Sequence, residues 1–347
     1  MKIAVYAISK NEEKHVDRFM ESAKDADLIV VTDTGSTDNT AENLKTKAIM
    51  LGKHRQFAVH NISINPWRFD TARNVALALV PADVDVCIRL DLDEVLDPGW
   101  RNALERAWIP GVTTQLWYDF THSPGYTFRA NYIHARHGYI WRGLDHEGLF
   151  LVAGKTGYPI YAPGLSITHH QDNSKPRTAI LGRLQAAVKE DQSARTAYYL
   201  GREYFYYKHS RECIDTLVDY LDKPDADWDV ERMDAMSMIA ESYFRLSDIG
   251  RCIQWYHRAI AEYQTREPYL GLAAVLYTVN NKELAFGLIQ HALRLTNKLT
   301  SMYVKPAAWD QTPYLAAAAC ARDLGFIDKA REFEGLALRG SSQWGER

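Results

Sequence analysis

The stretch VVTDTGSTDNT, residues 30–40, joins an apolar run to a polar segment through a Gly-Ser turn. The apolar run ends in Asp33, and Gly35 permits the positive φ that lets a backbone turn sharply. The polar residues that follow are typical of a helix start, with Asp38 or Thr40 as a candidate cap. The stretch therefore predicts a strand, a turn and a helix, with Asp33 at the carboxyl end of the strand.

The same alternation fills residues 1–110. Apolar runs predict strands at 2–8, 27–33, 55–64 and 84–91. Segments with apolar residues at helical spacing lie between them, at 15–25, 37–52 and 69–80. Strands separated by helices indicate βαβ units and a mainly parallel sheet, in which ligands bind beyond the carboxyl ends of the strands.

A second informative stretch, CIRLDLDEVL (87–96), ends a buried strand with three carboxylates. Asp91, Asp93 and Glu94 fall within four residues. Unpaired, these charges repel one another and resist burial, so a positive partner must reach them or they must stay in water. Asp33 and Asp91 both fall at predicted strand ends, where a ligand site is expected.

The bulk composition is that of a globular protein. The chain has 347 residues, which favours about two domains, with 46% hydrophobic residues and a net charge of −3. This net charge does not indicate a nucleic-acid-binding protein. No run approaches the roughly 20 apolar residues of a membrane span. The early charges of MKIAVYAISKNEEKH argue against a secretory signal, and the four cysteines are scattered. We expect a cytoplasmic protein with reduced thiols.

The amino-acid composition changes twice in the rest of the chain. Residues 111–175 are rich in Gly, Tyr, Trp and His, and we expect short strands and loops that close over the α/β half. Residues 176–347 are helical in composition, and small residues recur at Gly201, Ala240, Ala273 and Ala318. Their intervals of 39, 33 and 45 residues are near the ~34 of a tetratricopeptide repeat, with an irregular helical bundle as the alternative. We therefore expect two domains, 1–175 and 176–347.

Six motifs, in order along residues 1–190, resemble those of family 2 glycosyltransferases with the GT-A fold. They are AISKNEE (7–13), VVTDTGSTDNT (30–40), NPWRFDTARNVAL (65–77), RLDLDEVL (89–96), YIWRGLDHEGLF (139–150) and ITHHQDNSKPRTAILGRLQ (167–185). With the helices that follow, the chain is similar to lipopolysaccharide-core glucosyltransferases and to enzymes that glycosylate bacteriocin cysteines. The resemblance implies a GT-A α/β domain followed by an all-α tetratricopeptide-like domain.

The resemblance also implies a metal site. The D-x-D motif would bind Mn²⁺ or Mg²⁺, with Asp93 as direct ligand and Asp91 reaching the metal or the ribose. His169 aligns with the family histidine that completes the metal shell, and a capping or core histidine is the alternative. A hard divalent cation suits this role because it neutralises a departing diphosphate. The cation would also be the positive partner that the acidic cluster needs.

Further residues are implied to bind the nucleotide sugar. The base, ribose and diphosphate would contact Ala7, Asn11, Glu12, Asp33, Asp70, Arg73 and Asp91. Asp70 and Arg73 are three residues apart on a predicted helix, so an intrahelical salt bridge is the alternative for this pair. Glu12 could equally be an acidic residue at a helix N-terminus.

The family reaction inverts the anomeric carbon and needs a base to take the acceptor's proton. Glu147 is the candidate base, Asp145 is the alternative, and His146 would orient the donor or the base. Nearby apolar Trp141 and Leu144 would raise the pKa of such a carboxyl. A structural salt bridge is the alternative role for Glu147.

The expected function is transfer of a hexose from a nucleotide sugar, expected in the UDP-linked form, to an acceptor that the sequence does not name. A peptide or protein, a glycan and lipopolysaccharide core are all open, and the helices would present the acceptor or mediate dimerisation. The alternatives are an inactive nucleotide-sugar-binding scaffold and a transferase for a modified nucleic-acid base. A nucleotidyltransferase would need a glycine-rich loop after the first strand, which AISKNEEKH lacks.

Overall fold

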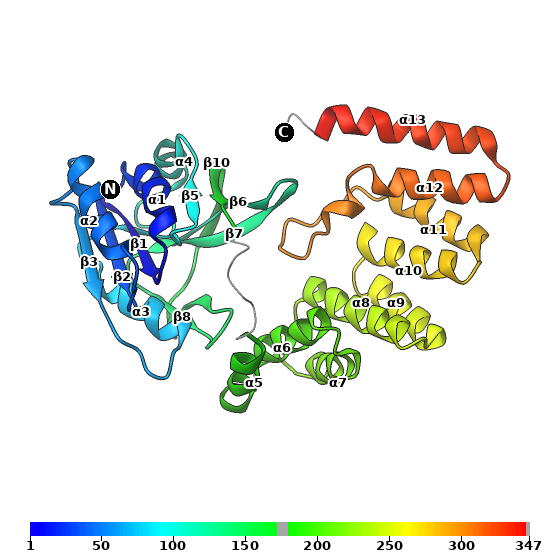
Figure 1. Cartoon of the computed structure of the whole chain (residues 1–347), viewed down its shortest axis with the longest axis horizontal. Coiled ribbons are helices and arrows are strands. Elements are labelled where there is room, and N and C mark those ends of the chain that lie inside the picture. Colours follow the sequence, from blue (N-terminus) through cyan, green and yellow to red (C-terminus); the bar gives the residue numbers. More distant parts are fainter. Residues whose placement is uncertain (172–179, 345–347) are drawn as a thin grey trace. The chain divides into compact units, whose positions relative to one another are not determined.

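The computed structural model describes residues 1–171 and 180–344 and divides into two compact units, Met1–Thr178 and Ala179–Arg347. Figure 1 shows an α/β unit at the N-terminal end of the chain and an all-helical unit at the other. This division confirms the predicted fold class. The predicted domain boundary between residues 175 and 176 lies outside the described residues and stays a prediction.

The N-terminal unit is built on an eight-stranded sheet in the order β3-β2-β1-β4-β7-β6-β10-β5. The strands are β1 (Ile3–Ser9), β2 (Leu28–Asp33), β3 (Phe57–Asn61), β4 (Val86–Arg89), β5 (Glu94–Leu96), β6 (Gln115–Ser123), β7 (Tyr126–Ala135) and β10 (Pro159–His169). Strands β3, β2, β1 and β4 run parallel, as the alternation of strands and helices predicts. Their carboxyl ends therefore meet at one edge of the sheet.

Helices cover both faces of this sheet because the side chains of β1 alternate between two cores. Ile3 and Val5 face the core shared with α1 (Val16–Ala23), α2 (Thr40–Met50) and α4 (Trp100–Ala107). Tyr6 points the other way, toward α3 (Phe69–Leu79) and the small sheet of β8 (Tyr139–Arg142) and β9 (Gly148–Leu151). The period of two along a strand sets this division, and it places α3 beside the β8–β9 hairpin.

The expectation of short strands in residues 111–175 is confirmed for β8 and β9, which have four residues each and form a separate small sheet, and is wrong for the three longer strands. In place of short strands that close over the sheet, β6, β7 and β10 have 9, 10 and 11 residues and join the main sheet. β7 pairs antiparallel with β4, and β10 runs parallel to β6. As a result the end of β10, which carries His169, pairs with β5, whose first residue is Glu94 of the acidic cluster.

The helical unit consists of consecutive antiparallel pairs. Its helices are α5 (Ile180–Glu190), α6 (Ala194–Tyr206), α7 (Ser210–Leu221), α8 (Asp229–Arg245), α9 (Ile249–Glu262), α10 (Arg266–Thr278), α11 (Lys282–Arg294), α12 (Thr312–Asp323) and α13 (Ile327–Trp344). Small residues lie where paired helices cross: a Cβ on Gly201 of α6 would come within 2.4 Å of Leu217 on α7. The predicted tetratricopeptide-like organisation is confirmed.

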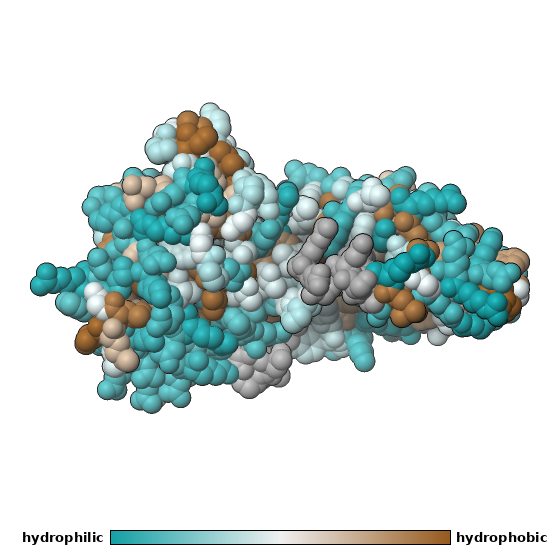
Figure 2. Space-filling model, turned by 90° about the horizontal axis from the view of Figure 1, so that it is seen from above, coloured by the Kyte–Doolittle hydropathy of each residue, from teal (hydrophilic) through white to brown (hydrophobic). Residues whose placement is uncertain are grey.

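On the face drawn in Figure 2, the apolar residues that are coloured form small separate patches. Within residues 1–171 and 180–344, no helix combines the length and the apolar character of a transmembrane segment. The four cysteines are buried free thiols, which agrees with packing as their role.

Candidate active site

An ion pair fixes the turn after β4. Arg73, on α3, holds Asp91 through two parallel bonds: Nη1 donates to Oδ1 at 2.5 Å and Nη2 donates to Oδ2 at 2.9 Å. Although burial by itself raises the pKa of Asp91, the Arg73 and Arg89 guanidiniums lower that pKa well below its ordinary value. Such bidentate pairs combine strength with fixed geometry. Asp91 is therefore a fixed anion at the edge of the sheet.

A second buried arginine, Arg89, pairs with the acidic cluster. Arg89, the last residue of β4, donates from Nη1 to both Glu94 oxygens at 2.8 Å and to Asp91 Oδ2 at 3.1 Å. Its guanidinium also lies 4.3 Å from the centre of the Tyr132 ring. Two of the three clustered carboxylates are thus neutralised by the protein itself, and Asp93 is the third.

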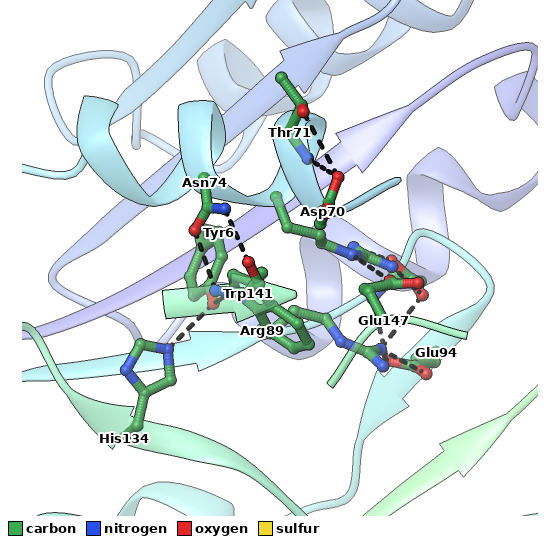
Figure 3. Close-up of polar contacts among 11 residues, drawn as sticks. Tyr6, Asp70, Thr71, Asn74, Arg89, Glu94, His134, Trp141 and Glu147 are labelled. Carbon is green, nitrogen blue, oxygen red and sulfur yellow. Dashed lines mark hydrogen bonds and ion pairs between the residues drawn. The ribbon is translucent and has the colours of Figure 1, made fainter. Parts of the chain in front are cut away.

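Arg73 also reaches the predicted base. Its Nε donates to Glu147 Oε1 at 3.0 Å, across 74 residues of sequence. Figure 3 shows Glu94 beside the guanidinium of Arg89. Two guanidiniums and three carboxylates (Asp91, Glu94 and Glu147) therefore share one site. The salt bridge considered for Glu147 exists, and it links the candidate base to the D-x-D turn.

Helix α3 is held against the β8–β9 hairpin by its polar side chains. Asn74 Nδ2 donates to the Trp141 carbonyl and Asn74 Oδ1 accepts from the Trp141 amide, both at 2.9 Å. Asp70 accepts from the Gly143 amide at 3.2 Å and pairs with Arg68. Asp70 pairs with Arg68, and Arg73 pairs with Asp91 and Glu147. The intrahelical salt bridge considered for Asp70 and Arg73 is therefore not among the ion pairs of the described residues. Asp70 and Asn74 position the loop that carries Glu147.

A chain of hydrogen bonds runs beneath the site. Trp141 Nε1 donates to Tyr6 Oη at 2.8 Å, and Tyr6 Oη lies 2.9 Å from His134 Nε2 (Figure 3). His134 Nδ1 lies 2.8 Å from the Ala135 carbonyl, which can only accept, so the neutral ring donates there and accepts from Tyr6. This network anchors the hairpin to the centre of the sheet, and it gives His134 a structural role.

The buried His134 predicts an acid-sensitive stability. Burial lowers its pKa from 6.5 to about 4, so between about pH 6.5 and 4 the unfolded chain takes up a proton there and the folded chain does not. Because the unfolded state binds more protons in this window, stability falls as the pH falls, by up to about 3 kcal/mol from this group. Urea unfolding at pH 7 and 4.5 measures the effect, and His134→Gln should flatten it. Equal pH dependence of the two chains would contradict the prediction.

The loops after β1 and β2 are joined by side chains from the predicted nucleotide site. Asn11, at φ 55°, donates from its backbone amide to Ser36 Oγ at 2.9 Å. Its side-chain oxygen Oδ1 accepts from the backbone amide of Thr37 at 2.8 Å. The Glu12 amide donates to Thr40 Oγ1 at 2.8 Å. These bonds form one continuous rim at the carboxyl edge of the sheet.

Asp33 closes the Gly-Ser turn. Oδ1 accepts from the Gly35 and Ser36 amides, and Oδ2 accepts from the Ser36 and Ser9 hydroxyls. Burial alone would raise the pKa of Asp33, but these hydrogen bonds lower it below its ordinary value. A carboxylate offers about four lone pairs, and all four are used here. A bond from Asp33 to a nucleotide therefore requires one of these donors to turn away.

Asp93 and His169 form the pair that suits a metal ion. His169 Nε2 lies 3.3 Å from Asp93 Oδ2, and this bond raises the pKa of His169. Across the described part of the chain, no three His, Cys, Asp or Glu side chains gather in an arrangement that could hold a metal ion. The pair thus fits a cation that takes its other ligands from water and a diphosphate, as Mg²⁺ does in nucleotide sites. The imidazole nitrogen favours Mn²⁺ over Mg²⁺, which prefers oxygen ligands.

The family of the N-terminal unit follows from its sequence. Residues 5–155 match the model described as glycosyl transferase family 2. These residues are a family 2 glycosyltransferase domain. The matched range contains the Arg73–Asp91 pair, Arg89, Glu94, Asp93 and Glu147, so the ion cluster lies inside the glycosyltransferase domain. His169 lies beyond the matched range but on β10 of the same unit.

Solved structures similar to the chain are related only distantly. MamA is 16% identical, with 48% of this chain and 90% of that chain covered and a TM-score of 0.39. PilF of Pseudomonas aeruginosa is 14% identical, with coverages of 46% and 65% and a TM-score of 0.36. TTC0263, a thermophilic TPR protein of Thermus thermophilus, is 15% identical, with coverages of 48% and 83% and a TM-score of 0.35. No curated protein matches the chain.

The structure adds site residues of the glycosyltransferase domain that sequence reasoning missed. Arg89, Glu94 and Asn74 hold the D-x-D turn and the hairpin, and none was a predicted site residue. An arginine inside the apolar run CIRLD was the available signal, because a charge on a buried strand needs a partner. Asp145 and His146 lie with Glu147 in the loop between β8 and β9.

Proposed function

We propose that the chain is a metal-dependent, inverting glycosyltransferase that moves a hexose from a UDP-linked sugar. One observation carries the proposal: in the N-terminal unit, which contains the family 2 domain, the Asp93–His169 pair adjoins an aspartate that two buried arginines hold. Family 2 domains imply a nucleotide-sugar donor and an acceptor. Parallel strands end at this same edge, which is where such sheets bind ligands.

Asp93 and His169 would hold Mn²⁺ or Mg²⁺. When bound, the cation supplies positive charge to the departing diphosphate. Asp91 has a different task in the proposal, because both its oxygens already accept from guanidiniums and a direct metal bond would require one of those bonds to break. Asp91 orients the turn that carries Asp93.

The nucleotide would lie along the rim formed by the loops after β1 and β2. Ala7 is fully buried in β1, so it offers only its backbone. Asn11 and Glu12 shape the rim through the bonds that join the two loops, and Asp33 fixes the turn. Asp70 and Arg73 act from the α3 side, where they position the D-x-D turn and the hairpin.

Glu147 would act as the general base. The acceptor's nucleophilic atom attacks the anomeric carbon on the face opposite the leaving group, and its proton passes to a Glu147 carboxylate oxygen. The bond from the anomeric carbon to the diphosphate oxygen breaks at the same centre, and UDP leaves with the electron pair. This exchange inverts the configuration. Asp145 is the alternative base on the same loop, and His146 would orient the donor or the base.

The acceptor is proposed to be a peptide or protein, a glycan or lipopolysaccharide core. Nucleic acid is a weaker proposal because the net charge of −3 offers no general attraction to phosphates. A cytoplasmic location and a homodimer formed through the helical unit stay predictions.

The first test is calorimetric titration of the full chain with UDP. We expect binding with a dissociation constant of about 1 µM to 1 mM, the usual range for enzyme substrates, only when Mn²⁺ or Mg²⁺ is present. EDTA should abolish it, because the diphosphate then meets Asp93 without a compensating cation. Hydrolysis of a panel of nucleotide sugars identifies the hexose. UDP binding that EDTA does not change would refute the metal dependence, and no binding at all would refute the UDP-linked donor.

A further inference from the structure

Within the described residues, the imidazole of His169 has a hydrogen-bond partner at only one of its two nitrogens. Nε2 lies 3.3 Å from Asp93 Oδ2, whereas Nδ1 is buried without a partner. The bond to Asp93 raises the pKa of His169, and the His122 backbone adds to this shift, but at a geometry that is not a hydrogen bond. Histidines that bind metals usually donate their second nitrogen to a carboxylate, a carbonyl or water, which fixes the ring. The orientation of this ring therefore depends on another kind of contact.

Flat rings from the hairpin of β6 and β7 pack against His169. The His122 ring is stacked on it, with ring centres 5.0 Å apart and an angle of 21° between the planes. The Phe120 ring is stacked on it as well, at 6.2 Å and 25°. Tyr126 meets His122 edge to face at 5.3 Å, so His122 is itself held by a neighbouring ring. Ring pairs at such separations are stabilised beyond the burial of their area, and they restrain how the rings turn.

An irregularity in the pairing of β6 with β7 falls on His122. Thr121 pairs with Thr127. The next pair joins Ser123 to Tyr126, so His122 is an extra residue on β6. Such bulges re-aim side chains and are over-represented beside active sites. The bulge and the ring stack therefore both single out His122, which lies outside the six sequence motifs.

The stacked arrangement argues against His122 as a further metal ligand. The lone pair of an imidazole nitrogen lies in the plane of its ring, and the planes of His122 and His169 are nearly parallel. A cation in the plane of one ring therefore lies outside the plane of the other. In the ranges 1–171 and 180–344, no three side chains of the metal-binding types gather around one point. The ring of His122 is thus placed to orient His169 rather than to bind the ion.

We propose that His122 is a positioning residue of the metal site: its ring, stacked on His169, holds that imidazole so that Nε2 and Asp93 face the same divalent cation. The proposal rests on the proposed glycosyl transfer, because it assigns a further residue to the metal site of that reaction. The flat face of the ring is what the stack requires, and the nitrogens of His122 are not needed for it. Phenylalanine therefore replaces His122 in this role, and a residue without a ring does not.

The test compares His122→Ala with His122→Phe in the full chain. The matched control is His137→Ala, an exposed histidine whose ring contacts the Ala82 carbonyl. Electron paramagnetic resonance of free Mn²⁺, in the presence of UDP, gives the Mn²⁺ affinity of each chain without turnover. The stack is read separately in the metal-free chain, from the ring-current shifts of the His169 protons, assigned with His169→Ala. Circular dichroism checks folding, and His122→Leu, which keeps much of the bulk without a ring, replaces His122→Ala if that variant does not fold.

We expect His122→Ala to lose about tenfold in Mn²⁺ affinity, as residues that orient metal ligands do, while His122→Phe and His137→Ala stay within about threefold of the wild type. Unchanged affinity in His122→Ala would overturn the proposal. Equal losses in His122→Ala and His122→Phe would overturn it too, because the nitrogens would then matter. Mn²⁺ binding that Asp93→Ala abolishes and His122→Ala leaves intact would refute the role of His122 alone. A wild-type chain that shows the stack but binds no Mn²⁺ would refute the metal dependence of the proposed function, and the role of His122 with it.

Discussion

Asp93→Ala is expected to abolish UDP binding that depends on Mn²⁺, with a loss of more than about 100-fold in affinity. Residues behind metal ligands already change metal affinity by about 10- to 100-fold, so a direct ligand should cost more. Asp93 is the member of the acidic cluster that the two buried arginines leave for another cation, and it lies 3.3 Å from His169. Calorimetry with UDP and Mn²⁺, and electron paramagnetic resonance of free Mn²⁺, measure the loss.

Two neighbouring histidines and a distant carboxylate provide the comparison variants for Asp93→Ala. His169→Ala should cause a comparable loss, whereas His170→Ala should not, because it is the His170 backbone amide that donates to the Asp93 carbonyl. Asp83→Ala removes an exposed carboxylate that pairs with Lys2, away from the site, and should change nothing. Unchanged Mn²⁺-dependent binding in Asp93→Ala would remove this residue from the metal site and leave the metal proposal without its main ligand.

The order of elements in the first 110 residues could be predicted because it is a local property. Each apolar run and each helical segment is read from its own residues, and the parallel pairing of β1, β2 and β4 follows from their alternation with helices. The sequence also places Asp33 and Asp91 at strand ends, since a strand end is marked by the residue that stops the apolar run. The repeat of small residues predicts the helix pairs for the same reason.

The partners of the charged residues could not be predicted in this way. Arg73 pairs with Asp91 and Glu147, which are 18 and 74 residues away, while the sequence suggested Asp70 as its neighbour on the helix. Asp70 in turn meets Gly143, 73 residues away, which places it against the hairpin. Local spacing reports on one helix face, and these pairs depend on how α3 packs against β4 and the hairpin.

The contacts of Asp33 and of residues 295–311 also depend on packing rather than on local sequence. Three residues that are close in sequence or joined by strand pairing donate four hydrogen bonds to Asp33, but only their geometry shows that no lone pair is left over. The 45-residue interval signals an insertion, yet it does not show that the inserted Tyr303 and Trp309 turn inward to glutamates of α8 and α10. In both cases the sequence identifies the residues, and packing decides which contacts they make.

Glu147→Gln is expected to leave UDP affinity unchanged while glycosyl transfer, or hydrolysis of the donor, falls by about 10²- to 10⁴-fold. The amide keeps the shape of the side chain and its oxygen still accepts from Arg73 Nε, but it no longer takes a proton. Folding should be retained, because Arg73 and Arg89 would then face two carboxylates, Asp91 and Glu94, in place of three. Initial rates with the nucleotide sugar found in the hydrolysis screen, at saturating Mn²⁺, measure the change.

Asp145→Asn is the matched variant, since Asp145 lies on the same loop and is the alternative base. A large rate loss in Asp145→Asn with none in Glu147→Gln would move the base by two residues and leave Glu147 as a partner of Arg73. A fall in UDP affinity together with the rate in Glu147→Gln would show instead that Glu147 acts through Arg73, by holding the guanidinium that orients Asp91. The separation of donor affinity from rate therefore distinguishes a proton acceptor from a structural ion pair.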